Sequence, residues 1–332
     1  MIWLTWRQFR VQALATFAAS TLLAIYLIIL GTQIRHSYNT DIAHCLTNNC
    51  AGVRDHFTET YGGQISAVGI LLIAVPALIG IFWGAPLVAR EFEDGTHRLI
   101  WNQSVTRTHW LAVKLALVGL ASLVATGALS LLLTWSTSRY DQLKGDRFAA
   151  DYFDSRNVVP LGYALFAFVL GTVIGLILHR ALVAMAVTLV VFAALQILIP
   201  SVVRSHYLPP KTTSVAVSAD SLSDAAFSIS PQAVNVFNYS APGAWSLSSK
   251  SEVFDASGKP VPGLSLSHCI SPGDNGPKVD GACLSKLNAH FDYTFQPAHR
   301  YWPFQWIELS IFVVLSALVA GLGFWWIRKR PS

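Results

Sequence analysis

Long uncharged stretches alternate with polar segments along this chain of 332 residues. Six stretches contain no Asp, Glu, Lys or Arg, and each offers about the 20 apolar residues that a helix needs to cross hydrocarbon. They are Val11–Ile34, Ile65–Ala89, Leu115–Trp135, Val158–Leu178, Ala181–Val203 and Leu309–Ile327. Because a backbone in lipid must satisfy its own hydrogen bonds, they predict an all-α membrane protein with six transmembrane helices. The alternating segments of about 10 residues typical of a membrane barrel are absent from the sequence.

The polar segments divide the chain into three parts. Residues 1–203 hold the first five spans, preceded by MIWLTWRQFR, whose Trp and Arg residues favour a short interfacial helix, with a disordered stub as the alternative. Residues 204–304 are a polar segment rich in Ser, Pro, Gly and Asn, which predicts a loop-rich region. Within it, VFDASGKPV (253–261) predicts two short strands around a Gly turn. Residues 305–332 hold the sixth span and a basic tail.

The distribution of charge predicts the orientation. Only 12% of the residues are charged, against about 25% in soluble domains. Six spans place both termini on one side, where the short segments 1–10, 90–114, 179–180 and 328–332 hold ten basic and three acidic residues. The positive-inside rule therefore predicts that both termini are cytoplasmic and that residues 204–304 are extracellular. The basic balance follows from this topology, and no motif for nucleic-acid binding is present.

All four cysteines fall on the extracellular side of this topology. Disulfides form in that compartment, so Cys45, Cys50, Cys269 and Cys283 are disulfide candidates. Four cysteines allow three pairings, of which the local bridges 45–50 and 269–283 are the simplest. A metal site built from His44, Cys45, Cys50 and His56 is the alternative, although its spacing matches no standard zinc pattern.

No catalytic motif occurs in the sequence. The phosphate-binding loop of ATPases, the nucleophile elbow, the H-E-x-x-H zinc motif and S-x-x-K are all missing. The sequence therefore predicts no enzyme, and no cofactor or metal held by this chain. Glu308, just inside the sixth span, is a candidate gate or polar site because ionisable groups in membranes are often functional. Contact with lipid headgroups, or pairing with Arg300, is the structural alternative.

Two features of the spans concern packing. Pro76, Gly80 and Pro86 permit a kink in the second span, and Gly171-x-x-x-Gly175 permits close helix contact in the fourth.

The segment REFEDGTHRLIWNQSVTRTHW (90–110) is too long for a simple turn between the second and third spans. On a helical wheel, one side carries Phe92, Leu99, Ile100 and Gln103, and another carries Glu91, Asp94 and Arg98. This pattern predicts an amphipathic helix at 90–104 on the cytoplasmic surface. The alternative is a connector that lies on the membrane without a partner.

The residues that follow predict the start of the third span. Ser104 or Thr106 would begin the next helix, and Arg107, His109 and Lys114 would face lipid phosphates.

This segment resembles the coupling helix of ABC-2-type transporter permeases. Members of that family carry, between spans two and three, a Glu followed four residues later by Gly-Thr or Gly-Ser, matched here by Glu91 and Gly95-Thr96. The run V-T-R-T-H-W is similar to the polar stretch before span three, with Arg107 at the family's Arg. Thr5-Trp6-Arg7-Gln8 is similar to the opening of actinobacterial members. The resemblance covers the whole chain in layout and about 25 residues in motif; the segment 204–304 is longer than is usual in the family.

The resemblance implies the ABC-2-type exporter fold and the permease subunit of an ATP-driven exporter in the bacterial plasma membrane. Two copies of a separate ATPase would bind ATP and Mg²⁺, a second permease would complete a homodimer, and lipid would surround it. Glu91 and Arg98 would contact the ATPase, Gly95 would allow close approach, and Phe92 and Leu99 would anchor the helix. Thr96 and Arg107 are further candidates for coupling to the ATPase. The cargo would be a hydrophobic or amphipathic drug, lipid or peptide. The alternative function is a membrane sensor or resistance module that signals through an ATPase.

Overall fold

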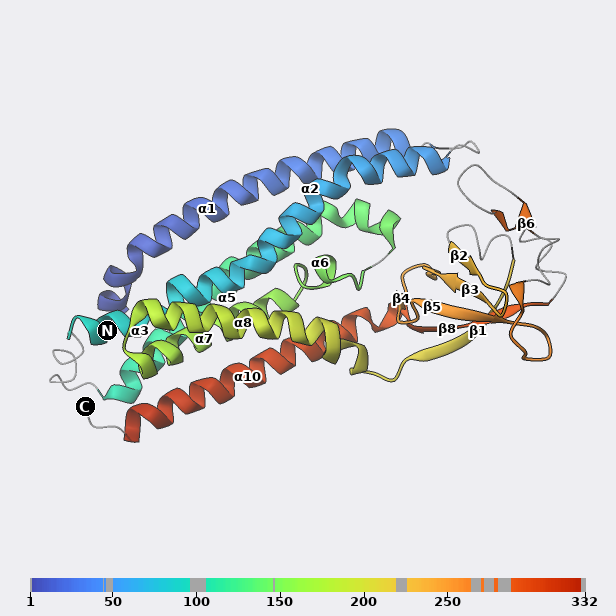
Figure 1. The fold of residues 1–332 in the computed structure, drawn as a ribbon. Coiled ribbons are helices and arrows are strands. Elements are labelled where there is room, and N and C mark those ends of the chain that lie inside the picture. Colours follow the sequence, from blue (N-terminus) through green and yellow to red (C-terminus); the bar gives the residue numbers. More distant parts are fainter. Residues whose placement is uncertain are drawn as a thin grey trace. The chain divides into compact units, whose positions relative to one another are not determined.

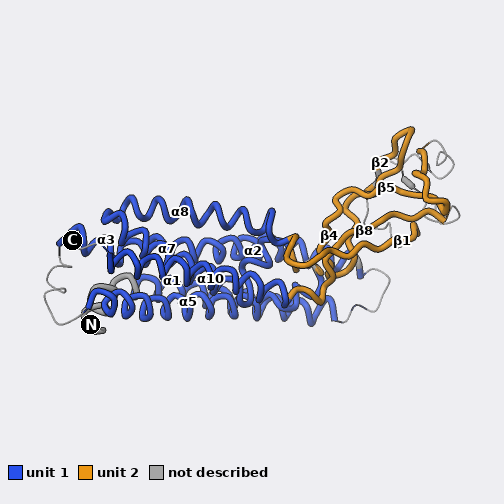
Figure 2. Tube along the Cα trace, turned by 90° about the horizontal axis from the view of Figure 1, so that it is seen from below, with its two compact units in different colours: residues 1–144, 149–204, 302–332 blue, residues 145–148, 205–301 orange. Residues whose placement is uncertain are grey.

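The computed structural model describes residues 2–43, 45, 50–95, 106–145, 147–218, 226–263, 270–271, 278–279 and 288–329. These residues form two compact units (Figure 2). Unit 1 comprises residues 1–144, 149–204 and 302–332, and unit 2 comprises residues 145–148 and 205–301.

Unit 1 is a bundle of long helices (Figure 1). In chain order, its α-helices are α1 (Ile2–Ser37), α2 (Cys50–Ile79), α3 (Ala85–Glu93), α5 (Arg107–Lys144), α6 (Ala150–Phe153), α7 (Val159–Leu178), α8 (Ala181–Leu198) and α10 (Tyr301–Lys329). Three π-helical turns adjoin them: η1 (Tyr38–Ile42) after α1, η2 (Gly80–Gly84) between α2 and α3, and η3 (Ile199–Val203) after α8. Short 3₁₀ turns are η4 (Arg204–His206) and η6 (Ala298–Arg300).

Six helical segments of the described residues are long and apolar enough to cross a membrane, which confirms the predicted number of spans. They are Leu14–Ile42, Gly52–Glu93, Arg107–Leu143, Val159–Leu178, Ala181–His206 and Ala298–Lys329. The second and third are longer than the uncharged stretches that predicted them. At the N-terminus, α1 begins at Ile2 and continues into the first span without a break. We call the end of the bundle that carries both termini the terminal end.

The helix α7 lies at the centre of unit 1, and small residues let it approach its neighbours. Gly171 of α7 faces Gly80 and Gly84 of the π-turn η2, and Gly175 of α7 faces Ala85 and Ala89 of α3. A Cβ at Gly80 would lie 2.7 Å from the carbonyl oxygen of Ala167, and one at Gly171 would overlap the carbonyl oxygen of Gly80. The close contact at Gly171-x-x-x-Gly175 is thus confirmed, and at the same crossing the α-helix of the second span is interrupted by the π-turn η2.

Unit 2 is built on a β-sheet, so the prediction of a loop-rich segment was incomplete. The strands are β1 (Lys211–Ala216), β2 (Ala226–Ile229), β3 (Val234–Phe237), β4 (Trp245–Ser246), β5 (Lys250–Phe254), β6 (Ile270–Ser271), β7 (Lys278–Val279) and β8 (His290–Gln296). The main sheet has the order β1-β8-β5-β3-β2, with β4 also paired to β8, and every pairing is antiparallel. β6 and β7 form a separate pair.

The core of unit 2 explains why these short segments fold as strands. In β8, Phe291 and Tyr293 are buried and lie two residues apart, as the alternation of side chains along a strand requires. Val236 of β3 and Val253 of β5 join them in one apolar cluster. The predicted strands around Gly258 are confirmed in part, since β5 ends at Phe254, which bridges back to Pro260.

Candidate coupling site

The candidate site lies where α3 ends, at the terminal end of unit 1. Glu91 is only 5% exposed, and its carboxylate Oε1 lies 2.7 Å from the Nζ of Lys114 in α5. Lys114 is 2% exposed; its ammonium group also donates a hydrogen bond to the carbonyl oxygen of Leu87 (3.1 Å) and lies 4.6 Å from the ring centroid of Trp110. The pair therefore joins the second span to the third through a buried charge on each side.

This placement changes the expected role of two residues. Lys114 does not face lipid phosphates as predicted, because its side chain is turned into the bundle toward Glu91. Glu91 is paired within the bundle in this structure, and a direct contact between Glu91 and an ATPase remains a prediction.

A second contact fastens the end of α3 to the beginning of α8. The Oε1 of Glu93 accepts a hydrogen bond from the backbone N–H of Ala181, the first residue of α8 (2.9 Å). The first N–H groups of a helix have no partner inside it, and a carboxylate there also meets the positive end of the helix dipole. Beside this contact, the ring of Phe92 lies 4.3 Å from the ring of His179, which ends α7. The last turn of α3 is thus held by α5 on one side and by the α7–α8 turn on the other.

The helix α3 ends earlier than the sequence predicted. Asp94 caps it with its N–H bonded to the carbonyl of Arg90, and Gly95 follows with a φ of +67°. This left-handed conformation is strained for residues other than glycine and is typical of the position just after a helix. The predicted helix over 90–104 is therefore interrupted at Gly95, and its part from 96 to 104 lies outside the described residues. Gly95 ends the helix there, and nothing lies within 4 Å of where its Cβ would be. Thr96, Arg98 and Leu99 lie outside the described residues.

The third span begins where predicted. Thr106 precedes the first residue of α5, Arg107, and its Oγ1 accepts a hydrogen bond from the backbone N–H of His109 (3.3 Å). This is the usual N-cap arrangement. Arg107 is half-buried at this position, on the first turn of the helix that carries Lys114.

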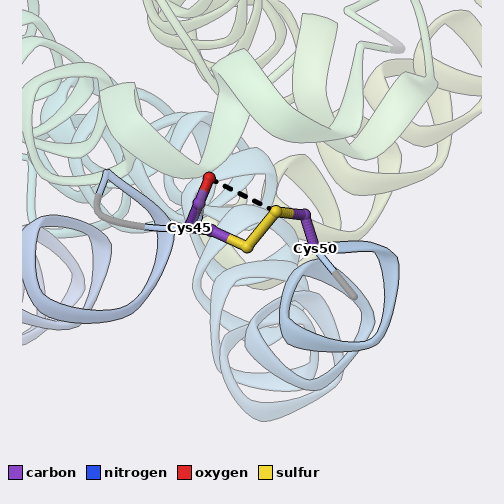
Figure 3. Close-up of a disulfide and its surroundings, with 2 residues drawn as sticks. All are labelled: Cys45 and Cys50. Atoms are coloured by element: carbon purple, nitrogen blue, oxygen red, sulfur yellow. Dashed lines mark hydrogen bonds between the residues drawn. A yellow bond between two sulfur atoms is a disulfide. The ribbon is translucent and has the colours of Figure 1, made fainter. Parts of the chain in front are cut away.

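At the other end of the bundle, Cys45 and Cys50 form a disulfide between η1 and the start of α2 (Figure 3). Their Cα atoms are 5.8 Å apart, and the carbonyl oxygen of Cys45 lies 3.3 Å from the sulfur of Cys50. The predicted local pairing is confirmed for these two residues. It leaves neither thiol to bind a metal, so the alternative metal site is wrong. Cys269 and Cys283 lie outside the described residues.

Glu308 lies in a buried group of charges at this same end. It is 0% exposed and accepts hydrogen bonds from Arg204, with Nε to Oε2 at 2.9 Å and Nη2 to Oε1 at 2.7 Å. Arg204 also pairs with Asp154, which precedes α7. The alternative that Glu308 pairs with Arg300 is wrong, because the partner of Glu308 is Arg204.

The helical bundle is similar in sequence to a known family of membrane proteins. A family model described as ABC-2 membrane transporter related matches residues 17–204, which is more than half of the chain. The chain belongs to this ABC-2 family. It is therefore a permease component of an ABC transporter and a multi-pass membrane protein, and its family implies an ABC ATPase as partner in general. No curated protein and no solved structure matches the chain.

The match to the ABC-2 family stops at Arg204, where unit 1 gives way to unit 2. It includes both fastenings of α3, because Glu91, Glu93, Lys114 and Ala181 all fall within it. In this permease the candidate coupling site thus lies within the matched residues, whereas residues 205–301 of unit 2 follow them.

Sequence reasoning missed Lys114, Asp154 and Arg204 as functional candidates. Lys114 stands one residue before an uncharged stretch and was assigned to the membrane surface. Arg204 and Glu308 are charges of opposite sign that lie close to the ends of the two spans flanking residues 205–301. Their opposite charges could have predicted an ion pair, because the ends of two spans that are joined by an inserted segment can lie next to each other.

Proposed function

We propose that this permease belongs to an ATP-driven exporter and that the end of α3 receives the motion of its ATPase. In this proposal the terminal end is cytoplasmic, and the segment that follows Gly95 contacts the ATPase. The observation that carries it is the double fastening of α3: Glu91 to Lys114 in α5, and Glu93 to the first N–H of α8. A displacement of the segment beyond Gly95 reaches both helices through these contacts.

The burial of the pair suits a mechanical connection. A salt bridge on the surface contributes about 0–1 kcal/mol and yields to small forces. Removing one partner of a buried pair costs about 3–5 kcal/mol, because the other charge is left without compensation. Glu91 and Lys114 are both at most 5% exposed, so they form a buried pair, and we expect the two helices that carry them to move together.

Gly95 supplies the complementary property. Its left-handed backbone ends α3. In this proposal the buried pair before Gly95 transmits a displacement, and the helix end at Gly95 separates α3 from the segment that contacts the ATPase. Two ATPase subunits working on two such permeases would drive the alternation between inward- and outward-facing states.

The proposed cargo is hydrophobic or amphipathic. Support comes from the uncharged composition of the six spans, whose lining offers apolar and aromatic contacts to a passing molecule. A drug, a lipid and a peptide all fit this chemistry.

The test is ATPase activity and transport in the reconstituted complex of the permease with its ATPase. We expect Glu91→Gln to keep the two proteins assembled but to lower cargo-stimulated ATP hydrolysis and transport at least 10-fold. Asp94→Asn is the matched control: it makes the same carboxylate-to-amide change three residues away on an exposed side chain, and should leave both rates unchanged.

Two results would contradict the proposal. Equal loss of transport in the Asp94→Asn and Glu91→Gln variants would show that the buried pair has no special role. ATP hydrolysis that responds to an extracellular compound without any transport would favour the sensor function.

A further inference from the structure

A compact group of charges lies at the end of unit 1 opposite the termini, and the proposed coupling does not use it. We call Asp154, Tyr163, Arg204 and Glu308 the Arg204 cluster. Asp154 stands in the α6–α7 connection, Tyr163 in α7, Arg204 at the start of η4, which follows α8 and η3, and Glu308 in α10. All four side chains are buried, with exposures between 0% and 3%.

Hydrogen bonds connect the four side chains directly. The Nη2 of Arg204 donates to Oε1 of Glu308 (2.7 Å) and to Oδ1 of Asp154, and its Nε donates to Oε2 of Glu308 (2.9 Å). The hydroxyl oxygen of Tyr163 is within hydrogen-bond distance of the same two carboxylate oxygens, Oδ1 of Asp154 (3.1 Å) and Oε1 of Glu308. Two carboxylate oxygens therefore meet at one guanidinium nitrogen and at one hydroxyl.

A count of protons shows that this arrangement is one short when both carboxyl groups are ionised. The hydroxyl of Tyr163 has a single proton and two acidic neighbours. With both neighbours ionised, one of the two contacts would set an oxygen lone pair against a negatively charged oxygen. A proton on one carboxyl group removes the conflict, because that group donates to Tyr163 while Tyr163 donates to the other.

The charge balance leads to the same result. One guanidinium faces two carboxylates, which leaves a net charge of −1 in a site with almost no access to water. Burying an uncompensated charge is costly, and buried groups take up a proton instead. Burial raises the pKa of Asp154 to about 7; Arg204 opposes this rise and Glu308 adds to it.

The neighbouring charged groups have other partners. In the α6–α7 connection, Arg156 pairs with Asp141 of α5, and in α6 the carboxylate of Asp151 accepts a hydrogen bond from Ser66 of α2. Another close neighbour is uncharged: the ring centroid of Phe153 lies 4.1 Å from the guanidinium carbon of Arg204. The excess negative charge of the Arg204 cluster is thus not balanced by these groups.

We propose that Asp154 and Glu308 bind one exchangeable proton between them, so that the Arg204 cluster is a proton-binding site joining α7, α8 and α10. The protonated site is the closed form, in which every contact has a proton to share. Loss of the proton sets the two carboxylates against each other and favours separation of α10 from the α6–α7 connection. Gln305 supports the closed form from α10, because its amide donates to the carbonyl of Phe153 (3.0 Å) and accepts from the N–H of Val159 (3.2 Å).

Infrared difference spectroscopy on the full-length permease in lipid nanodiscs tests this inference. A protonated carboxyl group has a carbonyl band that a carboxylate lacks. We expect the wild-type protein to lose such a band as the pH rises through neutrality. Asp154→Asn and Glu308→Gln should each remove that neutral-range change, because a single carboxyl group beside Arg204 stays ionised there and the amide supplies the donor for Tyr163.

Asp151→Asn is the control, since it makes the same change three residues away, in α6 and outside the cluster; this variant should still lose the protonated-carboxyl band as the pH rises through neutrality. The wild-type measurement stands even if a variant fails to fold. The proposal would be overturned if the wild-type protein lost no protonated-carboxyl band as the pH rises through neutrality. It would also be overturned if that pH-dependent loss persisted in a folded Asp154→Asn or Glu308→Gln variant. The measurement needs neither ATPase nor cargo, so its outcome is independent of the proposed export function.

Discussion

At the scale of single residues, the permease shows how a buried charge takes its meaning from its partner. Glu91 was identified from its sequence context, whereas Lys114 was not, although the two form one ion pair. Sequence gives each charge a position along the chain, but burial depends on which helices pack together. From sequence alone, a charged residue near the end of a span can therefore be wrongly assigned to the membrane surface, although its side chain faces the bundle.

The Glu91–Lys114 pair leads to a prediction about stability. Lys114→Met should lower the free energy of unfolding by about 3–5 kcal/mol, because it leaves the carboxylate of Glu91 buried alone. The double variant Glu91→Leu with Lys114→Met should be more stable than Lys114→Met, since neither charge then remains. Thermal unfolding in nanodiscs measures both, and a double variant less stable than the single one would contradict this account.

Asp255 leads to a prediction about pH in unit 2. Its Oδ1 accepts hydrogen bonds from the hydroxyl and N–H of Ser257 and from the N–H of Lys259, and the first of these is the main reason that the pKa of Asp255 is lowered. A lowered pKa in the folded state means that the contribution to stability is present above the unfolded-state pKa of about 4 and is lost as the pH falls through the folded value.

Hydrogen exchange at the amide of Lys259 measures this loss. Relative to amides of β3, exchange should speed up below about pH 4 in the wild-type protein. Asp255→Ala should show the faster exchange at every pH. An Asp255→Ala variant whose pH profile equals that of the wild type would show that the carboxylate does not hold this turn.

At the scale of elements, the helices were predicted better than the strands, and the reason is physical. A span is recognised from about 20 consecutive apolar residues, which is local information. The sheet of unit 2 pairs Lys211 with Phe295, so its pattern is completed only across the whole segment. Phe291 and Tyr293 alternate as a strand requires, but only Pro297 and η6 separate β8 from the aromatic residues that begin α10, so the local pattern does not set the strand apart from the following span.

The glycine crossing between η2 and α7 gives a prediction at this scale. Gly171→Ala should destabilise unit 1 by about 1–3 kcal/mol, because the new Cβ would overlap the carbonyl oxygen of Gly80 and the two backbones must separate. Gly321→Ala makes the same change in α10, where nothing lies within 4 Å of the new atom. It should be neutral or stabilising, because alanine is the better helix former. Equal melting temperatures for the two variants would contradict this interpretation.

At the scale of the whole molecule, the count of spans and the family were predictable, while the contacts between spans were not. The uncharged stretches gave the six spans, and the segment at 90–110 gave the family. The helix expected at the candidate site ends at Glu93, and Gly95 takes a left-handed backbone just after it. The Arg204 cluster needed three distant parts of the chain to meet, and no local pattern records that.

The orientation of the chain is testable at this scale. In a variant without the four native cysteines, we expect a cysteine at Ser257 to react with a membrane-impermeant thiol reagent in intact cells. A cysteine at Asp94 should react only after the membrane is opened, because the positive-inside rule places the terminal end in the cytoplasm. Labelling of Asp94→Cys in intact cells, without labelling of Ser257→Cys, would reverse the proposed topology.

The π-turn Gly80–Gly84 has a consequence for how far the end of α3 can move. A π-turn holds one residue more than the α-helix around it. If η2 rewound to an α-helix, that extra residue would pass into the helix and turn α3 by about 100° relative to α2, with an advance of about 1.5 Å. Glu91 would then swing away from Lys114. The π-turn therefore sets the rotational position at which Glu91 of α3 meets Lys114 of α5.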